Sequence, residues 1–227
     1  MMLKLNNVLE PHSGDKILYT GVDLENAKTA LILIHGRGST AESILPLANE
    51  LNLDDTIVIA PQADQFTWYP YRFIEKRERN EPGISSGLAL IDSIIYSLND
   101  SGISTDNIFL LGFSQGACLI LDYAARNPKK YAGIFALSGG LIGEKLNWND
   151  YSGNLEKTPV FLGCSDNDFH IPEERVHESG KIFNELSSDV TIKIYNNMGH
   201  TISYAEIEEM NTIISKHINE SIKNEQM

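Results

Sequence analysis

The feature of this 227-residue chain that most restricts its fold is a repeated alternation of short apolar runs with segments of helical period. A run of four to eight apolar residues that ends in a turn is typical of a strand buried on both faces of a parallel sheet. Such runs predict strands at 30–34, 56–60, 108–111, 131–137, 160–162 and 190–195. The helical segments between them indicate an α/β fold, with helices on both faces of a mostly parallel sheet.

Several segments around these strands carry more local signals. Ser39 with Glu42 and Ser203 with Glu206 have the spacing of capping boxes, which begin helices. Residues 3–24 are predicted to add antiparallel edge strands. Residues 61–86 show no clear period, and a connection of that length is usually functional or mobile. The length suits one large domain or two small ones, and we interpret residues 1–227 as a single α/β domain.

Composition disfavours several classes of partner and location. The net charge of −13 disfavours nucleic acids and anionic membrane surfaces, which repel a negative protein. No apolar stretch reaches the ~18 residues of a membrane helix, and the first residues lack a signal-peptide core, so we expect a cytoplasmic protein. Cys118 and Cys164 lie in apolar runs, which predicts reduced core thiols rather than a disulfide.

The motif with the clearest chemistry is Gly112-Phe113-Ser114-Gln115-Gly116. It follows an apolar strand and precedes a helix, which is the setting of a nucleophile elbow. In that turn the serine hydroxyl is exposed, and the flanking glycines let strand and helix approach closely. The motif alone is also compatible with an ordinary tight turn. Ser114 can be identified as a nucleophile only if the chain also supplies a base and an acid to activate it.

Those partners follow two later strands. His200 comes directly after the last strand, and Asp166 and Asp168 come directly after the preceding one. The chain order serine, aspartate, histidine is that of α/β-hydrolases. The residues by themselves leave the choice between Asp166 and Asp168 open. With His170 the two aspartates could suggest a metal site, but a hard cation needs more ligands than this segment supplies, so we expect no metal.

The first strand ends at His35-Gly36-Arg37-Gly38-Ser39, where glycines allow a sharp turn. In this fold, one oxyanion-hole amide comes from this loop and the other from the residue after the nucleophile. The backbone N–H groups of Arg37 and Gln115 are therefore the predicted oxyanion donors. A phosphate-binding loop is excluded, because no Gly-Lys-Ser/Thr follows.

With these residues in place, the chain over about 29–216 resembles the bacterial phospholipase/carboxylesterase family, which is related to the acyl-protein thioesterases. Its motifs match His35 to Gly38, Ala60-Pro61 with Trp68-Tyr69, Gly112 to Ala117, Ala136 to Gly139, Asp168 to Pro172, and Gly199-His200. The resemblance implies an α/β-hydrolase fold without a large cap domain, a Ser114–His200–Asp168 triad, no cofactor, and a monomer or homodimer. It also selects Asp168 over Asp166.

The implied reaction is hydrolysis of a carboxylic ester or thioester. Arg37 and Phe169 depart from the family pattern, where leucine and proline are common, which puts a direct transfer of the thioesterase substrate in doubt. Trp68, Tyr69 and Phe169 are the predicted substrate-binding residues. Residues 61–86 lack the long aliphatic run of a lipid tunnel, so we expect short to medium acyl esters, roughly two to eight carbons.

Other functions fit the same fold. An acyl-protein thioesterase or lysophospholipase is the main alternative. A dienelactone-hydrolase-like enzyme typically has cysteine at the elbow, where this chain has Ser114. A peptidase would be expected to carry a large cap or propeller. A non-catalytic binding protein would be expected to lose a triad residue or a loop glycine, and this chain keeps the full set.

Overall fold

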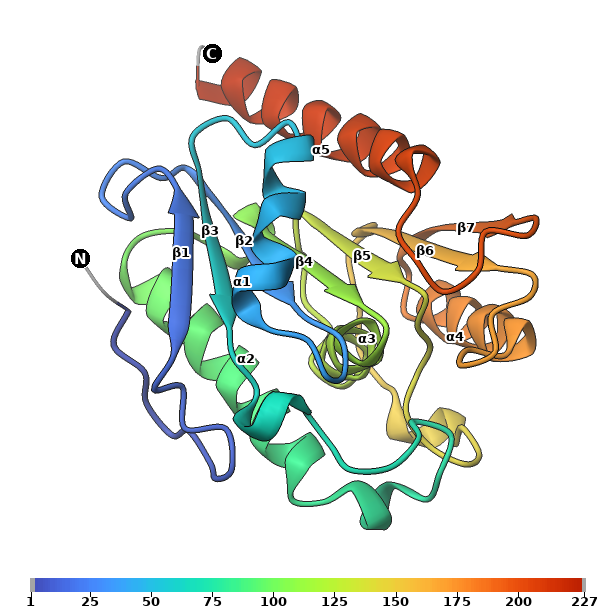
Figure 1. The fold of residues 1–227 in the computed structure, drawn as a ribbon. Coiled ribbons are helices and arrows are strands. Elements are labelled where there is room, and N and C mark those ends of the chain that lie inside the picture. Colours follow the sequence, from blue (N-terminus) through green and yellow to red (C-terminus); the bar gives the residue numbers. More distant parts are fainter. Residues whose placement is uncertain (1–2, 226–227) are drawn as a thin grey trace.

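The computed structural model describes residues 3–225, and the side chains of residues 3–221; the two residues at each end of the predicted domain lie outside this range. It contains one seven-stranded sheet with helices on both faces (Figure 1). The strands are β1 Ile17–Gly21, β2 Thr29–Ile34, β3 Thr56–Pro61, β4 Ile108–Phe113, β5 Gly133–Leu137, β6 Pro159–Ser165 and β7 Asp189–Tyr195. Their order in the sheet is β1-β3-β2-β4-β5-β6-β7, and all neighbours are parallel except β1 and β3.

The predicted mostly parallel sheet is therefore confirmed, with strand ends shifted by at most three residues. The prediction for residues 3–24 was only partly right, because β1 is the one strand among those residues that the structure describes. The segment before it runs along helix α2 (Gly83–Asp100) instead. There the amides of Lys4 and Asn6 donate to the hydroxyls of Ser97 (3.0 Å) and Ser93 (2.7 Å). These serines satisfy backbone donors that a strand would have paired with another strand.

The central strands are apolar on both faces because each face is covered. On β2, Ile32 and Ile34 belong to the core beneath α2, α3 (Gln115–Arg126) and α4 (Glu173–Glu185). Leu31 and Leu33 belong to the core on the opposite face, beneath α1 (Ala41–Ile44) and α5 (Tyr204–Glu225). Side chains of a strand alternate between faces, so a strand between two helix layers has no polar side.

The two predicted capping boxes had different outcomes. Ser203 and Glu206 form the expected reciprocal pair: the Ser203 amide donates to the Glu206 carboxylate (2.8 Å), and the Glu206 amide donates to the Ser203 hydroxyl (3.3 Å). The pairing of Ser39 with Glu42 was wrong by one residue, because Thr40 caps α1 and exchanges hydrogen bonds with Ser43. The Glu42 carboxylate instead pairs with Lys16, the residue before β1, 2.6 Å away.

Shorter 3-10 turns connect these elements. They lie at Leu45–Glu50, Asp64–Phe66, Arg77–Asn80, Thr105–Asn107 and Trp148–Asp150. Cys118 and Cys164 are free and buried, as predicted, and burial raises the pKa of each thiol to about 12. In the described part of the chain, no helix has the length and apolarity needed to cross a membrane.

Candidate active site

The backbone at Ser114 forms a sharp turn between β4 and α3. Its φ of 55° and ψ of −117° lie in a region that a non-glycine residue rarely occupies. The neighbouring strand supports the turn, because the Ser114 amide donates to the Leu137 carbonyl at 2.9 Å. Strain of this kind persists only where surrounding structure holds it, and it clusters at functional sites. The turn projects the Ser114 hydroxyl from the carboxyl edge of the sheet.

The two glycines of the motif are required by close backbone contacts. A Cβ on Gly116 would lie 2.2 Å from the Ile34 carbonyl oxygen, and one on Gly112 would lie 2.4 Å from the Gly116 carbonyl carbon. No side chain fits at those distances. The absence of both side chains lets α3 begin directly against the ends of β2 and β4, which brings Ser114 next to the first loop.

His200 and Asp168 lie beside Ser114, although they are far from it in sequence. The His200 Nε2 atom is 2.9 Å from Ser114 Oγ, and its Nδ1 atom is 2.7 Å from Asp168 Oδ2. An ionised carboxylate can only accept, so Nδ1 carries the proton and Nε2 accepts from the serine hydroxyl. The three groups thus form one hydrogen-bonded chain in which His200 can take the serine proton.

Asp168 is held as an ionised group by its own loop. Its Oδ1 atom accepts hydrogen bonds from the amides of His170 (2.8 Å) and Ile171 (3.2 Å). Burial alone would raise the pKa of Asp168, but the hydrogen bonds from His200 and these amides outweigh it and lower the pKa. A carboxylate in this state orients the imidazole and can stabilise its protonated form.

Asp166, the alternative acid, points to a different partner. Its Oδ1 atom accepts from the Asn197 amide at 2.8 Å, and the nearby Ser165 hydroxyl accepts from the Gly199 amide at 3.0 Å. Both contacts join the loop after β6 to the loop that carries His200. Asp168 therefore contacts His200, whereas Asp166 is exposed and bonds to the backbone of the loop that carries His200.

The loop after β2 approaches the nucleophile closely. A Cβ on Gly36 would lie 3.3 Å from the Ser114 Cβ atom. Among the residues that the structure describes, the amides of Arg37 and Gln115 donate no hydrogen bond. Free amides next to the serine are what an oxyanion hole requires, and their role as its donors remains our proposal.

The side chains of the same two residues fix the 66–71 segment over the site. The Arg37 guanidinium donates to the carbonyls of Pro70 (2.7 Å) and Tyr71, and lies 5.8 Å from the centre of the Tyr69 ring. The Gln115 amide group donates to the Tyr69 carbonyl at 2.8 Å and accepts from the Trp68 amide at 2.9 Å. The departure at Arg37 therefore provides an anchor for this segment, which leucine could not supply.

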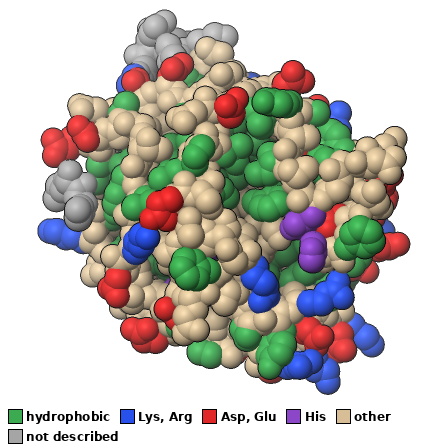
Figure 2. All heavy atoms as spheres, in the orientation of Figure 1, with side chains coloured by type: hydrophobic (Ala, Val, Ile, Leu, Met, Phe, Trp, Pro, Cys, Tyr) green, Lys and Arg blue, Asp and Glu red, His purple; other side chains and the backbone are tan. Residues whose placement is uncertain are grey.

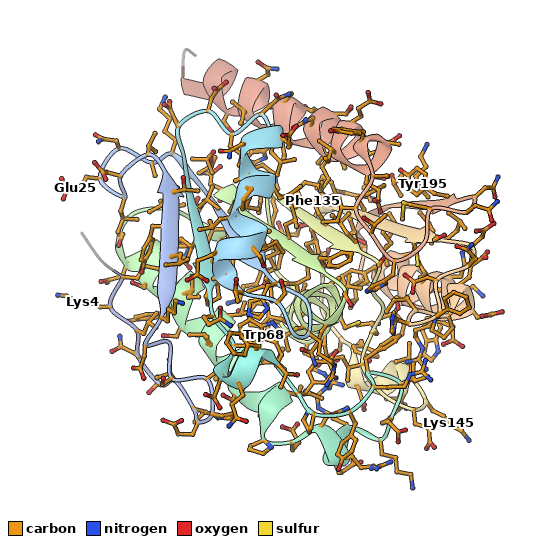
Figure 3. All side chains as sticks on the ribbon, viewed as in Figure 1. Lys4, Glu25, Trp68, Phe135, Lys145 and Tyr195 are labelled. Carbon is orange, nitrogen blue, oxygen red and sulfur yellow. The ribbon has the colours of Figure 1, made fainter. Side chains whose placement is uncertain are left out.

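The predicted substrate-binding residues are placed differently from one another. Tyr69 lines the cavity above Ser114, whereas Trp68 and Phe169 do not. Trp68, labelled in Figure 3, is fully buried, and its indole N–H donates to the His35 carbonyl at 2.9 Å. Phe169 is 93% exposed. The prediction placed both in the pocket. Trp68 instead bonds from the protein interior to the loop after β2, and Phe169 projects into solvent.

Two buried histidines, His12 and His35, hold this region in place. His12 accepts from the Asp64 amide (3.1 Å) and donates to the Trp68 carbonyl (2.9 Å). His35 accepts from the Ala63 amide (3.0 Å) and donates to the Gly36 carbonyl (2.7 Å). Each neutral ring uses one nitrogen as donor and the other as acceptor. No local motif marks His12, because its partners lie some fifty residues away in the chain.

These contacts predict a pH dependence of stability. Burial lowers the pKa of His12 in the folded protein, while the unfolded chain keeps the ordinary value of about 6.5. Below that pH the unfolded state binds more protons, so the free energy of unfolding falls as the pH falls. We expect denaturant titrations between about pH 7.5 and 5.5 to show this loss, with a shallower slope for His12→Gln.

His177→Gln is the matched control, because this histidine is 47% exposed and its one ion-pair partner among the described residues is Glu173 on the same helix. This control separates the loss of a buried histidine from the loss of an exposed one. If the free energy of unfolding of His12→Gln fell with pH as steeply as that of the wild type, the assignment of His12 as a group that the fold keeps neutral would be wrong.

A cavity of about 500 Å³ opens above the serine. Its wall contains Ser114 and His200 together with aromatic and charged residues, namely Arg37, Tyr69, Pro70, Tyr71, Arg72, Phe73, Glu75, Gln115, Cys118, His170 and Ile171. On the face shown in Figure 2, histidine side chains lie among hydrophobic ones, with Lys or Arg side chains nearby. Among described residues, no group of three or more His, Cys, Asp or Glu side chains could hold a metal ion.

Comparison with known proteins supports the same reading of the fold. The sequence profile of the phospholipase/carboxylesterase family matches residues 22–218. The crystal structure of a phospholipase/carboxylesterase from Dyadobacter fermentans is 41% identical, with a TM-score of 0.88 over 92% of this chain and all of that one. A carboxylesterase from Bacillus cereus, 19% identical, shares the fold with a TM-score of 0.69 over 89% of this chain and 94% of that one.

Among curated proteins, the chain is similar to fungal enzymes named acyl-protein thioesterase 1. The one from Kluyveromyces lactis is 39% identical over 59% of this chain, and the one from Aspergillus fumigatus is 32% identical over 63%. The matched region spans 60% of the length of each of these two relatives.

Proposed function

Because the chain belongs to the phospholipase/carboxylesterase family of α/β-hydrolases, we propose that it is a serine hydrolase that cleaves carboxylic esters through an acyl-enzyme on Ser114. The observation that carries this proposal is the hydrogen-bonded chain from Ser114 through His200 to Asp168, with distances of 2.9 and 2.7 Å. The positive φ of Ser114 and the open cavity above it present the hydroxyl to a substrate.

In the first half of the reaction, the Ser114 oxygen attacks the acyl carbonyl and His200 Nε2 takes the hydroxyl proton. The amides of Arg37 and Gln115 donate to the oxyanion that forms, and each such donor is worth about 3 kcal/mol in the transition state. The tetrahedral intermediate collapses when the C–O bond to the alcohol breaks, and His200 gives the proton to the departing oxygen.

In the second half, water replaces the alcohol. The water oxygen attacks the acyl carbonyl while His200 takes a proton from the water. The bond between the Ser114 oxygen and the acyl carbon then breaks, and His200 returns the proton to that oxygen. Asp168 stays ionised throughout and stabilises the imidazolium each time it forms. The products are a carboxylic acid, an alcohol and the free enzyme, so the cycle needs no cofactor.

Labelling with a fluorophosphonate probe tests the proposal directly. We expect one covalent adduct per chain, on Ser114, with loss of esterase activity in proportion to labelling. Peptide mapping of the adduct identifies the serine. A protein that is folded by circular dichroism, takes up no probe and hydrolyses no ester would contradict the proposal and would favour a binding function.

The names of the fungal relatives favour a second substrate class, acyl thioesters. The same two-step chemistry applies, because a thiolate can leave in place of an alkoxide. Kinetics on one acyl group presented as an oxygen ester and as a thioester separate the two. The cytoplasmic location and the monomeric or homodimeric state stay predictions from the sequence.

We expect the preference for longer acyl chains to end early. Each methylene contributes about 0.8 kcal/mol only while it finds apolar surface to bury against. In this cavity Tyr69, Phe73 and Ile171 share the wall with Arg72, Glu75 and His170. In a series of p-nitrophenyl esters, kcat/KM should peak at roughly two to eight carbons. A value that keeps rising through palmitate would contradict this and would favour a lipid or acyl-protein substrate.

A further inference from the structure

Most charged groups around the cavity already have partners. Arg37 donates to two backbone carbonyls. Glu75, the one carboxylate in the cavity wall, accepts from Arg79 at 2.7 Å. Arg79 also lies 4.5 Å above the Tyr71 ring, which fixes this ion pair against the rim. Glu75 is therefore neutralised by a neighbour and is a weak obstacle to a negative ligand.

Arg72 is the exception. It lines the cavity, yet its guanidinium forms no hydrogen bond or ion pair with any residue that the structure describes. Its backbone is nevertheless held in place: the Arg72 carbonyl accepts from the side chain of Asn80 (3.0 Å) and from the Glu75 amide (3.1 Å). Asn80 is fully buried and also accepts from the Tyr71 amide at 2.8 Å. A buried asparagine thus fixes the position from which Arg72 projects.

The Tyr69 hydroxyl is a different case. The Tyr69 side chain is only 2% exposed, and its hydroxyl has no hydrogen-bond partner among the described residues. That oxygen is enclosed by protein and lies close to the Cys118 thiol, so it is not presented to a ligand in the cavity. Tyr69 and Arg72 line the same cavity as Ser114. Among the described arginine and carboxylate side chains of the cavity wall, Arg72 is therefore the one without a partner.

From these groups we propose that the cavity selects esters that carry an anionic group, a carboxylate or a phosphate, which Arg72 binds at the cavity wall. The inference rests on the proposed esterase function and narrows its substrate class. A guanidinium matches both anions, because its parallel N–H groups donate to two oxygens at once. The net charge of −13 repels anions at long range, so an anionic substrate needs a local cation of this kind.

Matched substrate pairs test this. The first pair is p-nitrophenyl hydrogen adipate and its neutral methyl ester, with the carboxylate on the acyl side. The second is monobutyryl glycerol phosphate and monobutyryl glycerol, with the phosphate on the alcohol side. For the preferred pair, we expect Arg72→Gln to lower the ratio of anionic to neutral kcat/KM about fivefold to tenfold, mainly through KM, and added salt to weaken the wild-type preference.

Two variants control the result. Arg72→Lys keeps the charge and should retain much of the preference. Lys76→Gln removes one positive charge from an exposed residue of the same segment that does not line the cavity, and should leave the ratio unchanged. The proposal would be overturned if Arg72→Gln had the same ratio of anionic to neutral kcat/KM as the wild type in both pairs. It would also be overturned if Lys76→Gln lowered that ratio as much as Arg72→Gln does. Absence of hydrolysis for all four substrates would instead contradict the esterase function itself.

Discussion

Ser114→Ala is expected to lower kcat by about 10³-fold or more, while the protein remains folded. The variant loses the oxygen that forms the acyl-enzyme, so water must attack the substrate without covalent catalysis. Alanine tolerates the φ of 55° about as well as serine does, and its Cβ atom occupies the same position against Gly36. Steady-state hydrolysis of a short p-nitrophenyl ester measures the loss, and thermal unfolding verifies the fold.

Ser138→Ala is the matched control. Ser138 is a buried serine that also has a positive φ, 52°, and it directly follows the neighbouring strand β5. Its hydroxyl has no hydrogen-bond partner in the described part of the chain, so its removal should change kcat little. Near-normal ester hydrolysis by a folded Ser114→Ala protein would exclude the serine mechanism.

Asp168→Asn is expected to cost about 10⁴-fold in kcat, the magnitude known for the equivalent change in a serine protease. Asparagine can turn its NH₂ group toward His200, which favours the imidazole tautomer with the proton on Nε2. That tautomer cannot accept from the Ser114 hydroxyl, and the negative charge that stabilises the imidazolium is also gone. KM should change less than kcat, because the Asp168 side chain is buried and does not line the cavity.

Asp166→Asn serves as its control from the same loop. Its partner is the Asn197 amide, at 2.8 Å, and the side-chain oxygen of asparagine can accept that hydrogen bond equally well. We expect a change of a few fold at most. If Asp166→Asn were the more damaging of the two substitutions, the acid of the triad would have to be reassigned.

Much of this architecture could be predicted because its causes are local. A strand covered on both faces must be apolar at successive positions, so β2 and β4 stand out in the sequence. The turn at Ser114 requires glycines at fixed offsets, and contacts of 2.2 and 2.4 Å at Gly116 and Gly112 explain why. Parallel strands bring their carboxyl ends to one edge, so Ser114, Asp168 and His200 could be expected to meet there.

The placement of the side chains of residues 61–86 could not be predicted, because residues far away in the chain determine it. Its aromatic residues are alike in type, yet Trp68 is buried, Tyr69 lines the cavity and Tyr71 is about half exposed. His12 and Gln115 decide this by bonding to the backbone of Asp64, Trp68 and Tyr69. These hydrogen-bond partners lie outside residues 61–86, so no periodic pattern within the segment indicates the contacts.

The sheet, the turn at Ser114 and the chain order of the proposed triad could thus be predicted from the sequence, because steric limits and burial restrict which residue types can stand at neighbouring positions. The three-dimensional arrangement was needed to show that Asp168 contacts His200, that Arg37 bonds to the 66–71 segment, and that Phe169 faces solvent. It also showed that Arg72 has no partner among the described residues. Those outcomes depend on hydrogen bonds and ion pairs between segments far apart in the chain, and a side chain's partner is set by where the fold places it.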